Sequence, residues 1–398
     1  MEKMIYLDHA ATTKTRDEAV QAMMPYFGRY YGNASSIYSF ASESRKALSE
    51  ARKTIAEIIG AQPEEVYFTA SGTEADNFAV IGTARRIFRE SKGMKNRIVT
   101  SAIEHHAVLH SCKYLEKEGF EVKYVPVDAD GVIDIAELEK AVDKNTSVIS
   151  IIYANNEIGT IQPVTEIGEI AKRHGVMFHT DAVQAVGAIP VDVAAQNIDM
   201  LSLSAHKFYG PKGVGALYIK KGAKIDPYMH GGAQERKKRA GTENVAAVAC
   251  MSTALRIAAE RMPDESRRLV RLRDYAIGRI NMDIDHIKLN GHPVKRLPNN
   301  INFSFKYIEG EGLLLLLDSY GIMASSGSAC TSGSLDPSHV LIATGMDHET
   351  AHGSLRLTLG EDTTREDIDY AIDKLKIIVQ RLRDMSPLYK EQDRRRSV

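Results

Sequence analysis

Lys207 and Asp181 are the two residues whose types and spacing most directly suggest chemistry. Lys207 stands in "SLSAHKFYGPKGVG", after an apolar run that predicts a buried strand and before a turn rich in Gly and Pro. A lysine at a strand end is most often a surface residue whose stem packs while its amine stays in water. Burial, however, lowers the pKa of an amine and lets it form a Schiff base. Ser204 and His206 flank it with hydrogen-bond donors, which a phosphate beside such an imine needs.

Asp181 also ends a predicted strand, in "HTDAVQAVG", and precedes Lys207 by 207 − 181 = 26 residues. Pyridoxal phosphate needs a carboxylate at its ring nitrogen, because that anion keeps the ring a cationic electron sink. Gln184, three residues further on, could donate to the phenolic oxygen of the same ring. An isolated Asp at a strand end more often caps a turn. The pairing with Lys207 favours the cofactor site.

A third segment, "FTASGTEADN", predicts a strand, a tight turn and the first turn of a helix. The free N–H groups of a helix N-terminus, here near Gly72 and Thr73, can cradle a phosphate. The signal is weak by itself, because any capped helix looks similar. The chain contains no G-x-x-x-x-G-K-[ST] phosphate loop and no G-x-G-x-x-G fingerprint after its first strand.

Histidines follow another predicted strand in "SAIEHHAVLH". His105 or His106 could stack on a flat cofactor ring, or both could simply lie in a turn. His106 and His110 have the i, i+4 spacing of a metal-binding pair, but no Glu or Cys supports them. We therefore predict no intrinsic metal site.

Two further motifs place polar side chains in apolar surroundings. "YANNEIGT" puts Asn155, Asn156 and Glu157 after a strand of Ile and Val, where burial without partners is costly. "HGSLRLTLG" puts Arg356 inside an apolar strand. Its planar fork suits a carboxylate, although a structural ion pair is an equally ordinary use.

Cys330 lies in "SSGSACTSG", residues 325–333, among side chains too small to pack a core. The thiol is either a stray small residue or a group that must reach something. The other cysteines, Cys112 and Cys250, lie in helical stretches and are predicted to be packing residues. Three cysteines cannot form a disulfide framework, which favours a reducing, cytoplasmic location.

The 398 residues suffice for two domains, and 43% hydrophobic and 26% charged residues are typical of a globular protein. A net charge of −1 indicates neither nucleic acid nor an anionic membrane as a partner. The apolar run "GLLLLLD" is too short to span a bilayer. Alternating strand and helix patterns predict a mostly parallel sheet covered by helices, with ligands at the carboxyl ends of its strands. The predicted strands lie in "EEVYFTASG", "NRIVTSAIEH", "TSVISIIYANNE", "VMFHTDAVQ", "DMLSLSAHK" and "VGALYIK". We place a domain boundary near 260, where a long helical stretch is predicted to break at Pro263.

Together these stretches resemble the pyridoxal-phosphate-dependent cysteine desulfurases of the NifS/IscS type. The resemblance runs in order from Tyr6 to Gly360. It rests on "YLDHAATT", "GNASS", "FTASGTEADN", "EHHAVL", "NNEIGTIQP", "HTDAVQAVG", "SLSAHKFYGPKGVGALYI", "GGAQERKKRAGTEN", "SSGSACTSG" and "GSLRLTLG".

The resemblance implies an α/β fold of the pyridoxal-dependent transferases of fold type I, like that of aspartate aminotransferase. The large, cofactor-binding domain would span residues 14–260 and contain a mostly parallel seven-stranded sheet. Residues 1–13 with 261–398 would form a smaller α+β domain that carries the catalytic cysteine loop, about residues 324–334. The protein would be a homodimer with its sites at the subunit interface.

The resemblance also implies a role for each site residue. The catalytic residues would be Cys330, Lys207 and His105, with His105 as both the ring-stacking residue and a candidate base for the thiol. Asn33 and Arg356 would bind the substrate carboxylate, and Thr242 would reach the phosphate of the partner subunit. The cofactor would be bound by Gly72, Thr73, His105, Asn155, Asp181, Gln184, Ser204, His206, Lys207 and Thr242.

The implied reaction converts L-cysteine to L-alanine and leaves a persulfide on Cys330, whose loop must swing between site and acceptor. An iron–sulfur scaffold protein is the expected acceptor, on which Cys330 could transiently ligate a cluster. A tRNA-thiolation protein and a nitrogenase-dedicated scaffold remain open. Other hypotheses are a selenocysteine lyase, an aminotransferase, and a sulfur-relay subunit without enzymatic activity.

Overall fold

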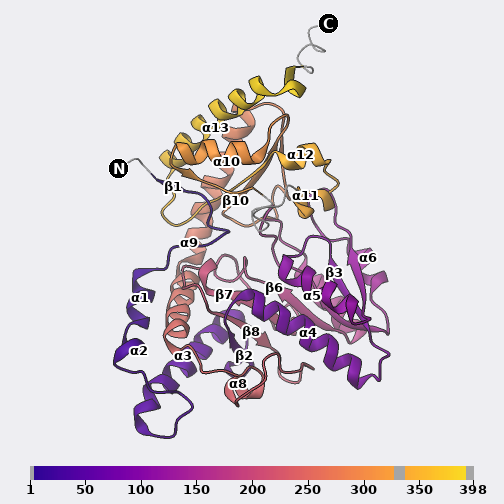
Figure 1. Cartoon of the computed structure of the whole chain (residues 1–398), viewed down its shortest axis with the longest axis vertical. Coiled ribbons are helices and arrows are strands. Elements are labelled where there is room, and N and C mark those ends of the chain that lie inside the picture. The colour runs from indigo at the N-terminus through magenta and orange to yellow at the C-terminus, as the bar shows by residue number, and fades with distance from the viewer. Residues whose placement is uncertain (1–3, 327–336, 391–398) are drawn as a thin grey trace.

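The computed structural model describes residues 4–326 and 337–390. It consists of a larger part built on a seven-stranded sheet and a smaller part built on a three-stranded sheet. In Figure 1 the smaller part, with α10 (Gly310–Ser319) and α13 (Arg365–Met385), lies at the top. The helix α9 (Val245–Asp283) passes from one part to the other.

The large sheet has the strand order β2-β8-β7-β6-β5-β3-β4. Every neighbouring pair is parallel except the two that involve β8, which is antiparallel to both β7 and β2. The strands are β2 (Val66–Thr69), β3 (Arg97–Ser101), β4 (Glu121–Val125), β5 (Thr146–Ser150), β6 (Met177–Asp181), β7 (Met200–Ser204) and β8 (Gly215–Ile219). The prediction of a mostly parallel sheet is confirmed.

The central strands are buried along their whole length, because helices cover both faces of the sheet. Such strands are near-continuous apolar runs, and for this reason six of the seven could be predicted from the sequence. The strand that was missed, β4, is at an edge, and Lys123 and Tyr124 within it are exposed. Its mixed composition therefore lacks the pattern of a buried strand.

Helices separate the successive strands from β2 to β6, as parallel crossovers require, and further helices precede β2 and follow β8. They are α1 (Asp17–Met23), α2 (Pro25–Gly28), α3 (Ser42–Ile59), α4 (Gly72–Glu90), α5 (His106–Lys117), α6 (Ile135–Ala141), α7 (Val164–His174) and α8 (Gln234–Lys237). Short 3-10 turns lie at Ser39–Ala41, Pro63–Glu65 and Ala205–Lys207.

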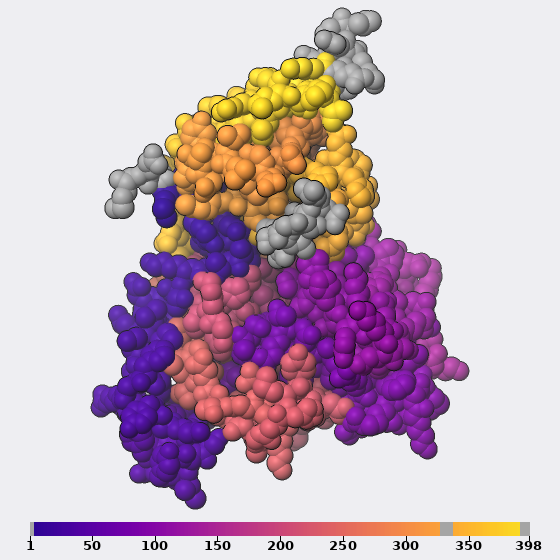
Figure 2. Space-filling model, in the orientation of Figure 1, coloured from indigo at the N-terminus to yellow at the C-terminus, as the bar shows by residue number. Residues whose placement is uncertain are grey.

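The smaller part contains an antiparallel sheet of order β12-β10-β9 and a parallel pair, β1 with β11. Its strands are β1 (Ile5–Tyr6), β9 (Ile287–Leu289), β10 (Asn300–Phe305), β11 (Ile322–Met323) and β12 (Ser354–Thr358), and its remaining helices are α11 (His339–Ala343) and α12 (His348–His352). The N-terminal strand thus belongs with the C-terminal third of the chain. Figure 2 shows the two parts as surfaces, with the first residues of the chain along one side.

The predicted break at Pro263 is wrong, because α9 is one helix from Val245 to Asp283 with Pro263 inside it. A proline removes one backbone donor and crowds the preceding turn. The helix is nevertheless packed on both sides of that point. Up to Ala258 its apolar residues join the core of the larger part, and from Leu269 onward they join the core of the smaller part. The helix therefore passes from the core of the larger part to the core of the smaller part without a break.

Among the described residues, no helix combines the length and the apolar character needed to cross a membrane.

Candidate active site

A cavity of about 260 Å³ lies at the carboxyl ends of the parallel strands. This position is expected, because the strand ends of an open α/β sheet leave a crevice between the loops that follow them. Nine predicted site residues line the cavity: Gly72, Thr73, His105, Asp181, Gln184, Ser204, His206, Lys207 and Arg356. Ala10, Ala11, Asp76, Ile152, Asn156 and Val183 complete its wall.

Lys207 ends the 3-10 turn that follows β7 and reaches across to the N-terminal segment. Its Nζ donates to the backbone oxygens of Ala10 at 2.5 Å and of Ala11 at 2.8 Å. The neighbouring His206 pairs through Nδ1 with the hydroxyl of Thr12 at 3.1 Å. Residues 10–12 therefore form one wall of the cavity and orient the amine within it.

Asp181, the last residue of β6, is buried in the same cavity. Its Oδ1 accepts the N–H of Val183 at 2.9 Å. Burial raises the pKa of Asp181 to about 6, and the Val183 N–H and the charge of Lys207 oppose that rise. A buried carboxylate that is only partly compensated is a good partner for a further cation.

Asp76, on the first turns of α4, is a second buried carboxyl beside Asp181 that the sequence analysis missed. It is 1% exposed, and its Oδ1 has no hydrogen-bond partner in the described part of the chain. Burial, followed by the charge of Asp181, raises the pKa of Asp76 well above its usual range. The one available signal was its i, i+4 relation to Gly72, which puts both residues on one face of the helix.

His105 is the N-cap of α5, and this role fixes the state of its ring. Its Nδ1 accepts the N–H of Ala107 at 3.1 Å, so the hydrogen of the neutral ring is on Nε2. Burial and the charge of Lys207 lower the pKa of His105 to about 4. A neutral, flat ring is suited to stacking. The same facts disfavour the predicted second role, as a base for the thiol.

One ligand atom from each of Asp76, His105 and Asp181 lies within 4.8 Å of the others. Two carboxyls and an imidazole are also donors that a divalent cation could use. The charge of Lys207, however, acts on both Asp181 and His105. Because a metal ion would be repelled by this ammonium, the geometry favours an organic ligand that takes up the amine.

The start of α4 forms the anion-binding end of the cavity. Ser71 caps the helix by accepting the N–H of Glu74 at 3.1 Å, which leaves other first-turn N–H groups for a ligand. A side chain at Gly72 would meet Val183 Cγ2 at 2.7 Å and Ser204 Cβ at 3.3 Å. Only glycine permits this close approach of helix and strands.

Arg356 lies in β12 of the smaller part and points into the cavity, where its side chain is 4% exposed. Its Nη2 donates to Oδ1 of Asp8 at 2.8 Å and its Nη1 to the backbone oxygen of Asn156 at 2.9 Å. Its Nε is buried and has no partner among residues 4–326 and 337–390. The structural ion pair considered from the sequence is present. These two bonds use two of the five N–H donors of the guanidinium, so the others can bind a ligand.

Four predicted site residues are not brought into this cavity. Asn155 is buried in a turn, where its Nδ2 donates to Ile103 O and its Oδ1 accepts the N–H groups of Glu157 and Ile158. Its neighbour Asn156 lines the cavity instead. Two others, Asn33 and Thr242, are exposed on the surface of the chain, and Cys330 lies outside the described residues.

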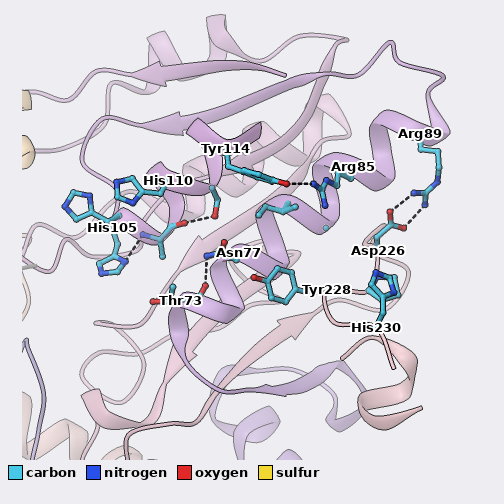
Figure 3. A pocket seen from close by; sticks show the side chains of 16 residues that line it. Thr73, Asn77, Arg85, Arg89, His105, His110, Tyr114, Asp226, Tyr228 and His230 are labelled. Atoms are coloured by element: carbon cyan, nitrogen blue, oxygen red, sulfur yellow. Dashed lines mark hydrogen bonds and ion pairs between the residues drawn. The ribbon is translucent and has the colours of Figure 1, made fainter. Parts of the chain in front are cut away.

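A larger hollow of about 940 Å³ adjoins the anion-binding end and shares Thr73 and His105 with the cavity. Figure 3 shows Tyr114, Tyr228 and His230 around it. Its arginines are paired with acids of the same chain, as Arg89 with Asp226 illustrates.

The prediction for the other two cysteines is confirmed. Cys112 and Cys250 are completely buried in hydrophobic cores. Burial raises the pKa of the Cys250 thiol to about 11 and raises that of Cys112 as well. Neither thiol is suited to act as a nucleophile.

Comparison with known proteins agrees with the motifs. The sequence profile of the family described as "Aminotransferase class-V" matches residues 5–371. A "Cysteine desulfurase IscS" of Methanosarcina thermophila is 54% identical, over 97% of this chain and 94% of its own length. A solved structure described as "NIFS-LIKE PROTEIN" has a TM-score of 0.88 at 37% identity, covering 96% of this chain and 100% of the other. Another, "SspA in complex with cysteine", has a TM-score of 0.78 at 34% identity, covering 89% and 98%.

Proposed function

The chain belongs to the class-V aminotransferase family and, within it, to the cysteine desulfurases, and from this premise we propose how its residues act. The substrate is L-cysteine, the products are L-alanine and a persulfide on Cys330, and the cofactor is pyridoxal phosphate. The observation that carries the proposal is that Lys207, Asp181 and Arg356 line one cavity. An amine, a buried carboxylate and a guanidinium are the groups that an aldehyde, a cationic ring and an amino-acid carboxylate require.

The cavity fits pyridoxal phosphate. Asp181 is a buried anion in need of a cationic partner, and Lys207 Nζ lies in the same cavity. The neutral ring of His105 would stack on the cofactor, and Gln184 would face its phenolic oxygen. The phosphate would bind Gly72, Thr73, Ser204 and His206. When bound there, the cofactor would supply an aldehyde for imine formation and a ring that withdraws electrons from the bound amino acid.

The residues of the chain would then orient the substrate and move its protons. Arg356 would hold the carboxylate of cysteine through N–H groups that its bonds to Asp8 and Asn156 leave over. Lys207, once released from the cofactor, would take the Cα proton and later return one. Nδ1 of His105 accepts the N–H of Ala107 and Nε2 then carries the hydrogen of the neutral ring, which favours Lys207 as the base.

Cys330 would attack the sulfur of the bound substrate. A bond forms between the two sulfurs, the Cβ–S bond of the substrate breaks, and alanine leaves. The thiol belongs to a segment that begins beside this cavity, because Ser325 and Arg356 bridge their backbones. Along the chain Cys330 is 330 − 325 = 5 positions from Ser325.

A homodimer is part of the proposal. Thr242 and Asn33 are exposed on the single chain and lie outside the cavity, so they can serve a site only across an interface. The hollow beside the anion-binding end offers room for a second copy to bring its Thr242 to the phosphate (Figure 3). We also propose a cytoplasmic location and an iron–sulfur scaffold protein as the sulfur acceptor.

The deciding experiment compares purified wild type with Cys330→Ala, and with Cys112→Ala as the matched control. We expect all three to carry the yellow cofactor, and wild type and Cys112→Ala to release alanine and sulfide from cysteine. Cys330→Ala should bind cysteine without releasing sulfide. Full-rate turnover by Cys330→Ala would refute the thiol assignment. Selenocysteine and a keto acid as alternative substrates test for a lyase and an aminotransferase.

A further inference from the structure

Glu157 is a buried carboxylate just behind the cavity wall. It follows Asn156, which lines the cavity, and is 4% exposed. Its Oε2 accepts the hydroxyl of Ser338 at 2.5 Å, across 181 positions of the chain. Ser338 is the N-cap of α11 and lies two positions after the segment 327–336 that contains Cys330. A group of the cavity wall thus binds the chain where this segment ends.

The next residue, His339, is bound to a second stretch of the chain that borders the cavity. Its Nε2 donates to the backbone oxygen of Glu104 at 3.0 Å. Glu104 directly precedes His105, the proposed stacking residue. Ser338 and His339 therefore contact the neighbours of two cavity-lining residues, Asn156 and His105.

At the other end of the segment, backbone bonds join Ser325 to the same site. The N–H of Arg356 donates to Ser325 O at 2.7 Å, and the N–H of Ser325 donates to Arg356 O at 3.2 Å. This bridge contains no group that titrates. The bond between Glu157 and Ser338, in contrast, contains a carboxyl group that titrates. Its strength can therefore change with pH.

Glu157 is placed to titrate in the neutral range. Burial raises its pKa to about 7, while the hydroxyl of Ser338 and the charge of Arg356 oppose the rise. Arg356 is itself paired with Asp8. Other charged or titratable groups on the described elements nearby include Arg296, which donates to Ile158 O, His339, whose pKa burial lowers, and Glu104, whose pKa burial raises.

Glu157 also holds the smaller part through its backbone. Its carbonyl oxygen accepts the side-chain amides of Asn300 at 3.0 Å and Asn302 at 2.9 Å, both in β10. These bonds hold the backbone of Glu157 whatever the charge of its carboxylate. The side chain separately binds the hydroxyl of Ser338 and lies within the influence of the charge of Arg356.

We propose that Glu157 is a positioning residue whose anionic carboxylate holds Ser338, and so the end of the Cys330 segment, against the cavity wall for sulfur transfer. The inference rests on the proposed function. A hydroxyl bonds a carboxylate more strongly than a neutral carboxyl. Attack by Cys330 should therefore be faster when Glu157 is ionised, while the binding of cofactor and cysteine stays unaffected.

The experiment is a single turnover of the holoenzyme with cysteine, followed in two ways. Stopped-flow absorbance of the cofactor reports substrate binding and proton transfer. Quenching by alkylation and mass analysis reports persulfide on Cys330. The variants are Glu157→Gln, which keeps an acceptor oxygen, Ser338→Ala and the double variant. Asp347→Ala is the matched control, because it removes the N-cap of the next helix, α12, without contacting Glu157.

At about pH 8 we expect Glu157→Gln and Ser338→Ala to form persulfide ~10-fold more slowly than wild type. The cofactor signal should be unchanged, and the double variant should be no slower than either single variant. At about pH 6 wild type and Glu157→Gln should differ by about twofold or less, because wild-type Glu157 is then protonated. Asp347→Ala should match wild type at both pH values.

Two results would overturn the proposal. One is wild-type persulfide formation in both single variants at about pH 8. The other is a ratio between wild type and Glu157→Gln that is the same at both pH values, which indicates a purely structural role. A wild type that shows no cofactor response to cysteine would instead refute the proposed function itself. If Glu157→Gln does not fold, the rate of persulfide formation in Ser338→Ala still tests the proposal.

Discussion

Arg356 and Ser325 form an antiparallel backbone bridge, in which each residue donates its N–H to the carbonyl oxygen of the other. The side chain of Arg356 lines the cavity, and Ser325 leads into the segment with Cys330. The residue proposed to hold the substrate and the start of the segment proposed to deliver the thiol therefore share one rigid element. Movement of β12 relative to the large sheet would displace both together.

The first prediction concerns the substrate carboxylate. Arg356→Lys should raise KM for cysteine by ~10- to 100-fold, with a smaller change in kcat, because a lysine cannot reproduce the planar fork. The carboxylate is held equally before and during the reaction, so its loss acts mainly on KM. Steady-state kinetics of alanine release measures both values.

Arg273→Lys is the control for that substitution. Arg273 is also buried, but it donates to the backbone oxygens of Arg296 and Leu297 within the chain. The Arg273→Lys substitution should lower the melting temperature and leave KM for cysteine unchanged. An Arg356→Lys variant with wild-type KM would contradict the assignment of the carboxylate site.

The second prediction concerns the buried acids. Asp181, with a pKa of about 6, is neutral below that pH and anionic above it. Only the anion can pair with the cationic ring, so the affinity of the apoprotein for pyridoxal phosphate should rise between about pH 5 and 7. Asp181→Asn should weaken binding by ~10-fold or more at pH 7 and make the ratio of wild-type to variant affinity fall toward pH 5. Ionisation of the cofactor phosphate affects both proteins equally, so it does not change the ratio of wild-type to variant affinity.

Asp76→Asn is the matched comparison in the same cavity. Burial and the charge of Asp181 raise the pKa of Asp76 well above its usual range, which favours the neutral carboxyl that an amide imitates. We expect a change in cofactor affinity of about threefold or less. An effect as large as that of Asp181→Asn would mean that Asp76 is the anion facing the ring.

The third prediction tests the shared site of the dimer. Lys207→Ala and Thr242→Ala should each be nearly inactive as homodimers. Co-expressed with different tags, they should form mixed dimers in which one site has Lys207 from one subunit and Thr242 from the other. That site is native, so the purified mixed dimer should recover about half of the wild-type activity per dimer. No recovery would place Lys207 and Thr242 in the same subunit's site, or show that no shared site exists.

The fourth prediction concerns stability. Burial raises the pKa of Glu104 to about 8, while in the unfolded chain it is about 4.5. The stability that its proton contributes is present below about pH 4.5 and is lost as pH rises toward 8, because the unfolded chain gives up this proton first. Glu104→Gln removes the free-energy cost of a buried carboxyl at high pH, so this variant should melt ~2–8 °C above wild type at about pH 8.5.

At about pH 5 the melting temperatures of wild type and Glu104→Gln should nearly coincide. Glu116→Gln, on the exposed face of α5, is the control and should match wild type at both pH values. Calorimetry or thermal unfolding followed by circular dichroism measures the difference. A gap between wild type and Glu104→Gln that does not change with pH would contradict the buried, protonated carboxyl.

The local pattern of the chain was enough to predict the central sheet and most of the residues that line the cavity. Strands buried on both faces are continuous apolar runs, and Lys207, Asp181 and Gly72 stand directly after such runs. Because parallel strands end at one edge of the sheet, residues that follow them meet there. This reasoning needs only the order of elements.

The same reasoning does not reach outcomes that depend on competition between local forces and packing. Pro263 lies inside α9 because the helix is anchored in two cores, and its cost is absorbed along 39 residues. Asn155 satisfies its amide within a turn, although by position alone it could equally have faced the cavity. Neither choice is visible in the neighbouring residues.

By itself, then, the sequence determined the family and the fold class, and it indicated that Lys207 and Asp181 follow buried strands, since residue types and their place after strands are local properties. Only the tertiary structure decided that Asp76 adjoins Asp181, that Arg356 pairs with Asp8 and that Glu157 binds Ser338. The last two contacts join residues 348 and 181 positions apart. Such contacts form only when the smaller part packs against the sheet, because this packing brings distant residues together. The burial that shifts the pKa of a charged group also arises only then.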